Sequence, residues 1–178
     1  MKQKTKILIC CVVVLIAAVG LLISRGFRNV PIPRSSSETL SIISSATSIE
    51  TYRVKRTGSF GDERIGDYHI VGKGLNPNRE TAKHLKAIFT SHLHNKANPM
   101  GQKGCAPPEP GVAIRFIQGD TFVDILLCFQ CYDLMVMNDT SSEWRDFNFP
   151  EADRDALIKV AKALFPDDTD IQKISATH

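Results

Sequence analysis

The chain has 178 residues, 43% of them hydrophobic and 23% charged, with a formal net charge of +3. The positive balance belongs to the first 28 residues, because the segment from Asn29 onward carries 17 basic against 19 acidic side chains, a net charge of −2. A nucleic-acid-binding protein is therefore not expected, since no clustered basic stripe interleaved with aromatic residues is present.

The N-terminal segment, residues 1–28, reads as a signal-anchor. Three lysines precede an apolar run over residues 7–23, which is near the minimum length for a transmembrane helix and longer than most cleavable apolar regions. We expect a single-pass membrane protein anchored through residues 7–23. The positive-inside rule places the N-terminus in the cytoplasm and the C-terminal domain outside. The alternative is secretion after cleavage near Gly26.

A Ser- and Pro-rich stretch follows the apolar run. Residues 29–48 contain Pro31, Pro33 and a run of three serines, a composition typical of linkers. Residues 49–178 are long enough for one extracytoplasmic domain.

The first half of this domain predicts two strands and a helix. Segments 49–56 and 67–71 are rich in β-branched and aromatic residues and enclose a Gly-containing loop. A helix is expected to begin at Asn76-Pro77, a cap followed by proline, and to bury Ala82, Leu85, Phe89 and Leu93 on one face.

The strongest pattern is a hairpin over residues 112–129. Two apolar runs meet at Gly119-Asp120, a sequence that favours a two-residue type II′ turn. Such a turn fixes the register. The expected pairs are Phe116 with Val123, Ile114 with Ile125, Val112 with Leu127, Ile117 with Phe122, Ala113 with Leu126, and Arg115 with Asp124.

A further strand over 134–137 and a helix from near Pro150 to Pro166 complete the domain. The expected fold is α+β: a mainly antiparallel sheet of about five strands with two helices on one face, preceded by the N-terminal transmembrane helix. The acidic residues beyond the last helix, Asp167, Asp168 and Asp170, are expected to be a solvated terminus because they lack the pattern of a calcium loop.

Arg115 and Asp124 are the two charges in the body of the hairpin. A cross-strand ion pair accounts for both of them without a substrate, so a structural role is favoured over anion binding or acid–base chemistry.

Three cysteines are candidate site residues. The register puts Cys128 opposite Gly111, so that Cys105 and Cys131 can approach it. Oxidising conditions outside the cytoplasm favour a disulfide, most simply from Cys105 to one of the other two. The alternatives are three buried reduced thiols and a site for zinc or another thiophilic metal, which needs a fourth ligand: His69, His92 or His94.

The C-x-x-C spacing of Cys128 and Cys131 does not predict a thioredoxin-type enzyme. That chemistry uses a cysteine at a helix N-terminus, whereas the residues after Cys131 read as a strand. No Ser-His-Asp arrangement is apparent in the sequence, and a binding or structural role is favoured over an enzymatic one, which stays open. No cofactor is expected beyond the alternative metal.

The segment from Cys105 to Cys131, with Pro-Gly-Val-Ala-Ile-Arg-Phe and Val-Asp-Ile-Leu-Leu-Cys-Phe-Gln-Cys, resembles a family of uncharacterised bacterial exported or membrane-anchored proteins. The resemblance implies a bacterial envelope location and no particular activity. We therefore expect a membrane-tethered binding or structural module, stabilised around the cysteines, whose partner is an envelope protein or a small ligand. The alternative is a thiol-disulfide or metal-handling envelope protein.

Overall fold

The computed structural model describes residues 36–58, 61–94, 111–138, 141–148 and 151–175. The chain divides into two units, residues 1–32 and 33–178, and all described residues belong to the second, a compact one. The expected membrane helix over 7–23 lies outside them. Within the described ranges no helix has the length and apolar character needed to cross a bilayer.

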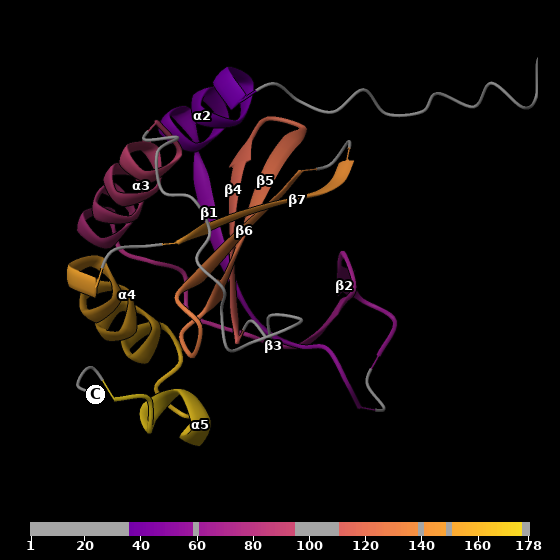
Figure 1. Ribbon diagram of the computed structural model, residues 1–178, viewed down its shortest axis with the longest axis vertical. Helices are drawn as coiled ribbons and strands as arrows, with labels where there is room; N and C mark the ends of the chain where they lie inside the picture. The colour runs from indigo at the N-terminus through magenta and orange to yellow at the C-terminus, as the bar shows by residue number, and fades with distance from the viewer. Residues whose placement is uncertain (1–35, 59–60, 95–110, 139–140, 149–150, 176–178) are drawn as a thin grey trace, which may run out of the picture. The chain divides into compact units, whose positions relative to one another are not determined.

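The second unit is an α+β domain built on one antiparallel sheet (Figure 1). Its strands lie in the order β2-β3-β1-β4-β5-β6-β7. The elements in chain order are α2 Ser36–Ser45, β1 Ser48–Lys55, β2 Arg64–Ile65, β3 Tyr68–Lys73, α3 Arg79–His94, β4 Val112–Gln118, β5 Thr121–Cys128, β6 Asp133–Asn138, β7 Ser141–Asn148, α4 Glu151–Leu164 and α5 Thr169–Gln172.

The expected fold class is confirmed, but the expected numbers of strands and helices are not. The sheet has seven strands rather than about five, and α2, α3 and α4 all contribute to the core on one of its faces. Strand β7 was missed because its sequence, Ser-Ser-Glu-Trp-Arg-Asp-Phe-Asn, contains no β-branched residue and no buried-strand pattern. Its pairing with β6 defines it.

Helix α2 corrects the expected linker over residues 29–48. Ile43 is fully buried and Ile42 nearly so, both within the main core. The serines that made this stretch resemble a linker occupy the exposed face of α2, as Ser41, Ser44 and Ser45 show. The folded domain therefore begins before residue 49.

The hairpin register is confirmed at every predicted pair from Val112–Leu127 to Ile117–Phe122. Gly119 has φ +58°, while Asp120 keeps a negative φ, as a type II′ turn requires. Helix α3 begins later than expected. Its cap is Asn78 rather than Asn76, because the Asn78 Oδ1 accepts a hydrogen bond from the Thr81 backbone N–H at 2.8 Å.

The sheet has a buried cluster on each face. The larger cluster lies under the helices and includes an edge-to-face contact between Phe89 and Phe116, whose ring centroids are 5.8 Å apart. The smaller cluster, on the other face, contains Tyr52, Val54, Ile65, Tyr68, Ala113, Leu126, Met135 and Met137. Burial raises the pKa of Tyr68 to about 12, which is consistent with a ring enclosed in this second cluster.

Candidate functional site

A groove with many basic side chains lies where β1 ends, beside the loop that follows β5. Its volume is 590 Å³, within the range of small-molecule sites. We call it the cationic groove and define it by its lining residues: Arg53, Val54, Lys55, Arg56, Thr57, Gly111, Phe129, Gln130, Arg154, Asp170, Ile171, Lys173, Ile174 and Ser175.

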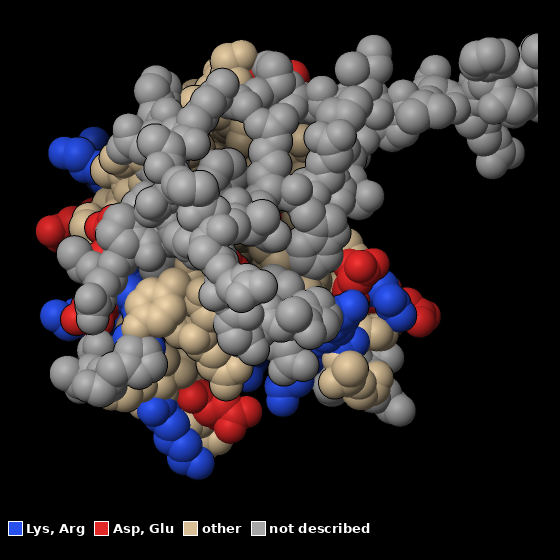
Figure 2. Space-filling model, viewed as in Figure 1, with Lys and Arg blue, Asp and Glu red and all other residues tan. Residues whose placement is uncertain are grey.

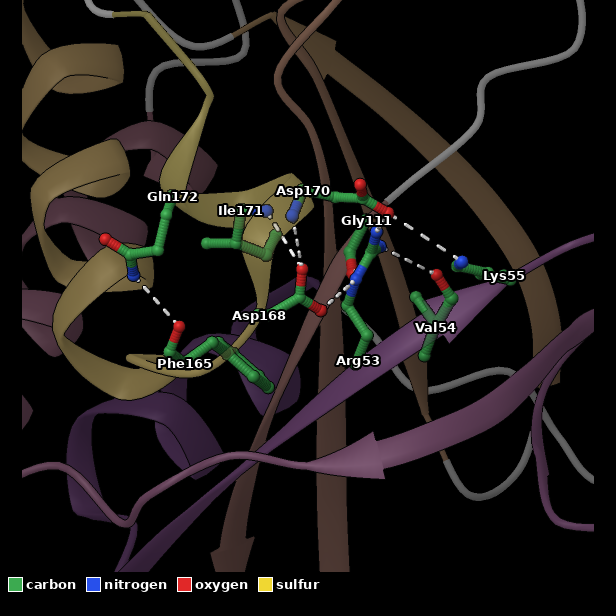
Figure 3. A network of polar contacts seen from close by, with 9 residues as sticks. All are labelled: Arg53, Val54, Lys55, Gly111, Phe165, Asp168, Asp170, Ile171 and Gln172. Carbon is green, nitrogen blue, oxygen red and sulfur yellow. Dashed lines mark hydrogen bonds and ion pairs between the residues drawn. The ribbon is translucent and has the colours of Figure 1, made fainter.

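Arg53 joins β1 to α5 at the edge of the cationic groove (Figure 3). Its Nε donates to the Asp168 Oδ2 at 2.9 Å, and its Nη1 donates to the Gly111 carbonyl oxygen at 2.7 Å. The register of β1 against β3 shifts between Arg53 and Val54, and such a bulge re-aims the side chain beside it. Arg53 is thereby fixed against the C-terminal segment.

Asp168 is the partner of Arg53 at the contact between β1 and α5. Its Oδ1 accepts the backbone N–H groups of Asp170 and Ile171, each at 3.0 Å, and so caps α5. Burial opposes ionisation of this carboxyl, but the Ile171 N–H and the Arg53 guanidinium outweigh it and lower the pKa of Asp168. The expected solvated acidic terminus is therefore wrong for Asp168, which anchors α5 to the sheet.

Arg154, in the first turns of α4, is the buried cation of the cationic groove. Its side chain is 6% exposed. Its Nε lies 3.4 Å from the Phe129 carbonyl oxygen, and its guanidinium carbon lies 4.9 Å from the centroid of the Tyr132 ring. Both contacts come from the loop that joins β5 to β6, so this loop positions the guanidinium.

The lining of the cationic groove combines positive charge with apolar surface. Of its described side chains, five are Lys or Arg and one, Asp170, is acidic. Val54, Phe129, Ile171 and Ile174 supply the apolar part. Figure 2 shows basic and acidic side chains together at the lower end of the view, where α5 lies in Figure 1. Such a lining suits a negatively charged group attached to an apolar body.

Two of the three predicted cysteines lie together beside the cationic groove. Cys128 ends β5, Cys131 lies in the following loop, and their Sγ atoms are 2.8 Å apart. Both are buried, and no disulfide bond joins them. Cys105 and the side chains of His92 and His94 lie outside the described residues. Among the residues that are described, no three His, Cys, Asp or Glu side chains are placed to hold a metal ion.

Arg115 and Asp124 form a two-pronged ion pair away from the cationic groove. The Arg115 Nε and Nη2 donate to the two Asp124 carboxylate oxygens at 2.7 and 2.8 Å. The guanidinium carbon lies over the Phe122 ring at 4.2 Å and near the Tyr52 ring at 5.4 Å. Burial and a hydrogen bond to Glu50 raise the pKa of Tyr52 to about 12. This packing is that of a structural pair.

A larger hollow of 1110 Å³ runs between α3 and the start of β1. Arg79, Lys83 and Lys86 of α3 line it, but the Lys86 Nζ is used to hold the Ala46 carbonyl oxygen at 2.6 Å. The exposed Arg79 and Lys83 make this an open cationic helix face. No charged residue that lines this hollow is buried, whereas Arg154 of the cationic groove is. The cationic groove is therefore the stronger candidate site.

A scan against protein-family models, a search of curated proteins and a search of solved structures each found no match for the chain. The family resemblance of the hairpin stays a prediction.

The sequence analysis did not single out the cations of the groove, although the position of Arg154 in its helix indicated a buried charge. Arg154 shares a helix face with Leu157, Ile158 and Ala161, all buried, and a cation on the apolar face of an amphipathic helix indicates a buried charge. Arg53 left no such signal, since its partner Asp168 is 115 residues away.

Proposed function

We propose that this protein is a membrane-tethered binding module whose domain binds a small organic anion in the cationic groove. The observation that carries the proposal is the lining of this groove, in which the buried guanidinium of Arg154 lies with four other Lys or Arg side chains and an apolar surface. The Arg154 guanidinium already contacts the Phe129 carbonyl oxygen, the Tyr132 ring and, at 3.9 Å, the Asp155 Oδ1. What supports an anionic ligand is the excess of Lys and Arg over acidic side chains in a groove that also has an apolar lining. The apolar run over residues 7–23 supports the tether.

The groove chemistry supports a carboxylate or phosphate group bound to an aromatic or aliphatic body. Arg154 would meet the anionic group, since a guanidinium matches the two oxygens of a carboxylate or phosphate. Phe129 and Ile171 would cover the apolar body. Lys55 and Lys173 at the rim would attract the anion and fine-tune its affinity.

The first test is calorimetric titration of the full chain in a non-ionic detergent with benzoate and phenyl phosphate. Benzyl alcohol is the neutral control, because it retains the ring and lacks the charge. Both anions should bind, and binding should weaken as salt rises. Benzyl alcohol should bind at least about tenfold more weakly, since it lacks the negative charge that the cations of the groove attract. Equal affinity for the alcohol and the anions would contradict the proposal.

Substitutions locate the binding site. Arg154→Met should weaken benzoate binding about tenfold or more, and Lys173→Gln about two- to fivefold because its charge lies at the rim. Lys83→Gln, in the hollow along α3, is the matched control and should leave the affinity unchanged. If Arg154→Met does not fold, the Lys173→Gln and Lys83→Gln pair still decides, and equal losses in both would place binding elsewhere.

A further inference from the structure

The two thiols at the end of β5 lie where a single bond would control the loop beside the cationic groove. The Cys128 and Cys131 Sγ atoms are 2.8 Å apart, so the formation of a disulfide bond of about 2.05 Å needs less than an ångström of movement. This differs from the sequence-based expectation, in which Cys105 takes part in the disulfide.

We propose that Cys128 and Cys131 form a reversible disulfide that increases the affinity of the cationic groove for its anion. The second half of this inference rests on the proposed function, whereas the first half does not. The site of modification is the pair itself, and the oxidant it takes is a low-molecular-weight disulfide of the glutathione class or a disulfide-donating protein.

The reaction begins at Cys131, because it is 8% exposed while Cys128 is fully buried. The Cys131 thiolate attacks one sulfur of the oxidant, forms a mixed disulfide and releases one thiol. The Cys128 thiolate then attacks the Cys131 sulfur of that mixed disulfide and releases the second thiol. The protein loses two protons and two electrons, and the oxidant disulfide is reduced to two thiols.

The link to the groove runs through the loop that joins β5 to β6, residues 129–132. The bond would close residues 128–131, and Tyr132 follows directly. The Phe129 carbonyl oxygen and the Tyr132 ring both contact the Arg154 guanidinium. Tyr132 has φ +58°, a conformation that costs a residue with a side chain free energy and persists only where the surroundings hold it. A disulfide at the neighbouring Cys131 would restrain that conformation, and Arg154 with it, before the ligand arrives.

Trypsin makes the pairing directly measurable on the full chain. No Lys or Arg lies between Arg115 and Arg145, so Cys128 and Cys131 share the peptide 116–145, while Cys105 lies on the peptide 104–115. After treatment with oxidised glutathione and alkylation of the remaining thiols, we expect peptide 116–145 to lack two hydrogen atoms and carry no alkyl group. Dithiothreitol should restore two alkylation sites.

Two results would overturn the pairing: alkylation of both cysteines after oxidation, or a cross-link between peptides 104–115 and 116–145. Cys105→Ser is the matched control and should leave the intrapeptide disulfide intact. Cys131→Ser should abolish it, and unfolding measurements would show whether this variant folds.

Benzoate titration of the oxidised and reduced full chain tests the coupling. The oxidised form should bind about two- to tenfold more tightly, the gain expected from fixing one flexible side chain and its loop beforehand. A disulfide that forms without changing the affinity would overturn the coupling alone. If neither form binds benzoate or phenyl phosphate, the proposed function fails while the mass measurement still decides the disulfide.

Discussion

At the scale of single residues, the Arg115–Asp124 pair gives the sharpest prediction. The Asp124 side chain is 4% exposed and that of Arg115 22%, so Asp124→Ala would leave a guanidinium half-enclosed between aromatic rings with no carboxylate. We expect a loss of about 2–3 kcal/mol in the free energy of unfolding, measured by urea denaturation. Asp120→Ala, in the exposed turn of the same hairpin, is the control.

A double variant distinguishes the cost of a buried charge without a partner from the loss of the attraction between the two charges. Replacing both partners, as Arg115→Met with Asp124→Leu, should cost less than Asp124→Ala alone, since no buried charge then lacks a partner. A loss below about 0.5 kcal/mol for Asp124→Ala would instead show that water solvates the pair.

The contrast between two ion pairs shows what the sequence reveals at this scale. Arg115 and Asp124 were predictable, because a two-residue turn fixes the register of the residues on either side of it. Arg53 and Asp168 were not, since their contact depends on how α5 docks on β1. Alternation along a strand says which face a side chain occupies, but not which distant loop will cover it.

At the scale of elements, the short α5 depends on the charge of Asp168. Its pKa is lowered in the folded protein. At acidic pH the unfolded chain therefore binds more protons than the folded protein does. The stabilisation is present above the unfolded pKa of about 3.9 and is lost as the pH falls through the lower folded pKa. Acid should therefore loosen the junction between α5 and β1.

Asp168→Asn tests this because asparagine also caps helices and removes only the charge. We expect a loss of about 0.5–1 kcal/mol near pH 6, the value of a partly exposed ion pair. The free energy of unfolding should then fall less steeply on acidification than in the wild type, over urea titrations from about pH 6 to pH 3. Asp167→Asn, an exposed neighbour, should leave this slope unchanged.

Elements differ in how far their own residues define them. Helices α3 and α4 and the β4–β5 hairpin were predicted because each carries a full amphipathic or apolar pattern and a start or turn signal. Helix α2 and strand β7 carry mostly Ser and polar residues, so their structure comes from the partners they pack on. Local propensity is a weak guide where tertiary contacts supply the stability.

At the scale of the whole molecule, the N-terminal boundary of the folded unit can be tested, because packing places it earlier in the chain than the sequence pattern predicted. Ile42 and Ile43 of α2 belong to the same buried cluster as Leu85 of α3 and Phe116 of β4. A fragment of residues 33–178 should therefore unfold in one cooperative urea transition, whereas a fragment of residues 49–178 exposes the core surface that α2 covered.

Burial of an isoleucine side chain contributes about 1.5–3 kcal/mol, so removing α2 should cost roughly 3–6 kcal/mol, a large share of the stability of a typical domain. The shorter fragment should show a lower urea midpoint or no transition. Ile43→Ala in the full chain should lose about 2–4 kcal/mol by leaving a cavity, and Ser41→Ala on the exposed face of α2 should lose almost nothing. Equal stability of the two fragments would contradict this prediction and show that residues 36–48 belong to the linker, because a helix that adds no stability is not part of the core.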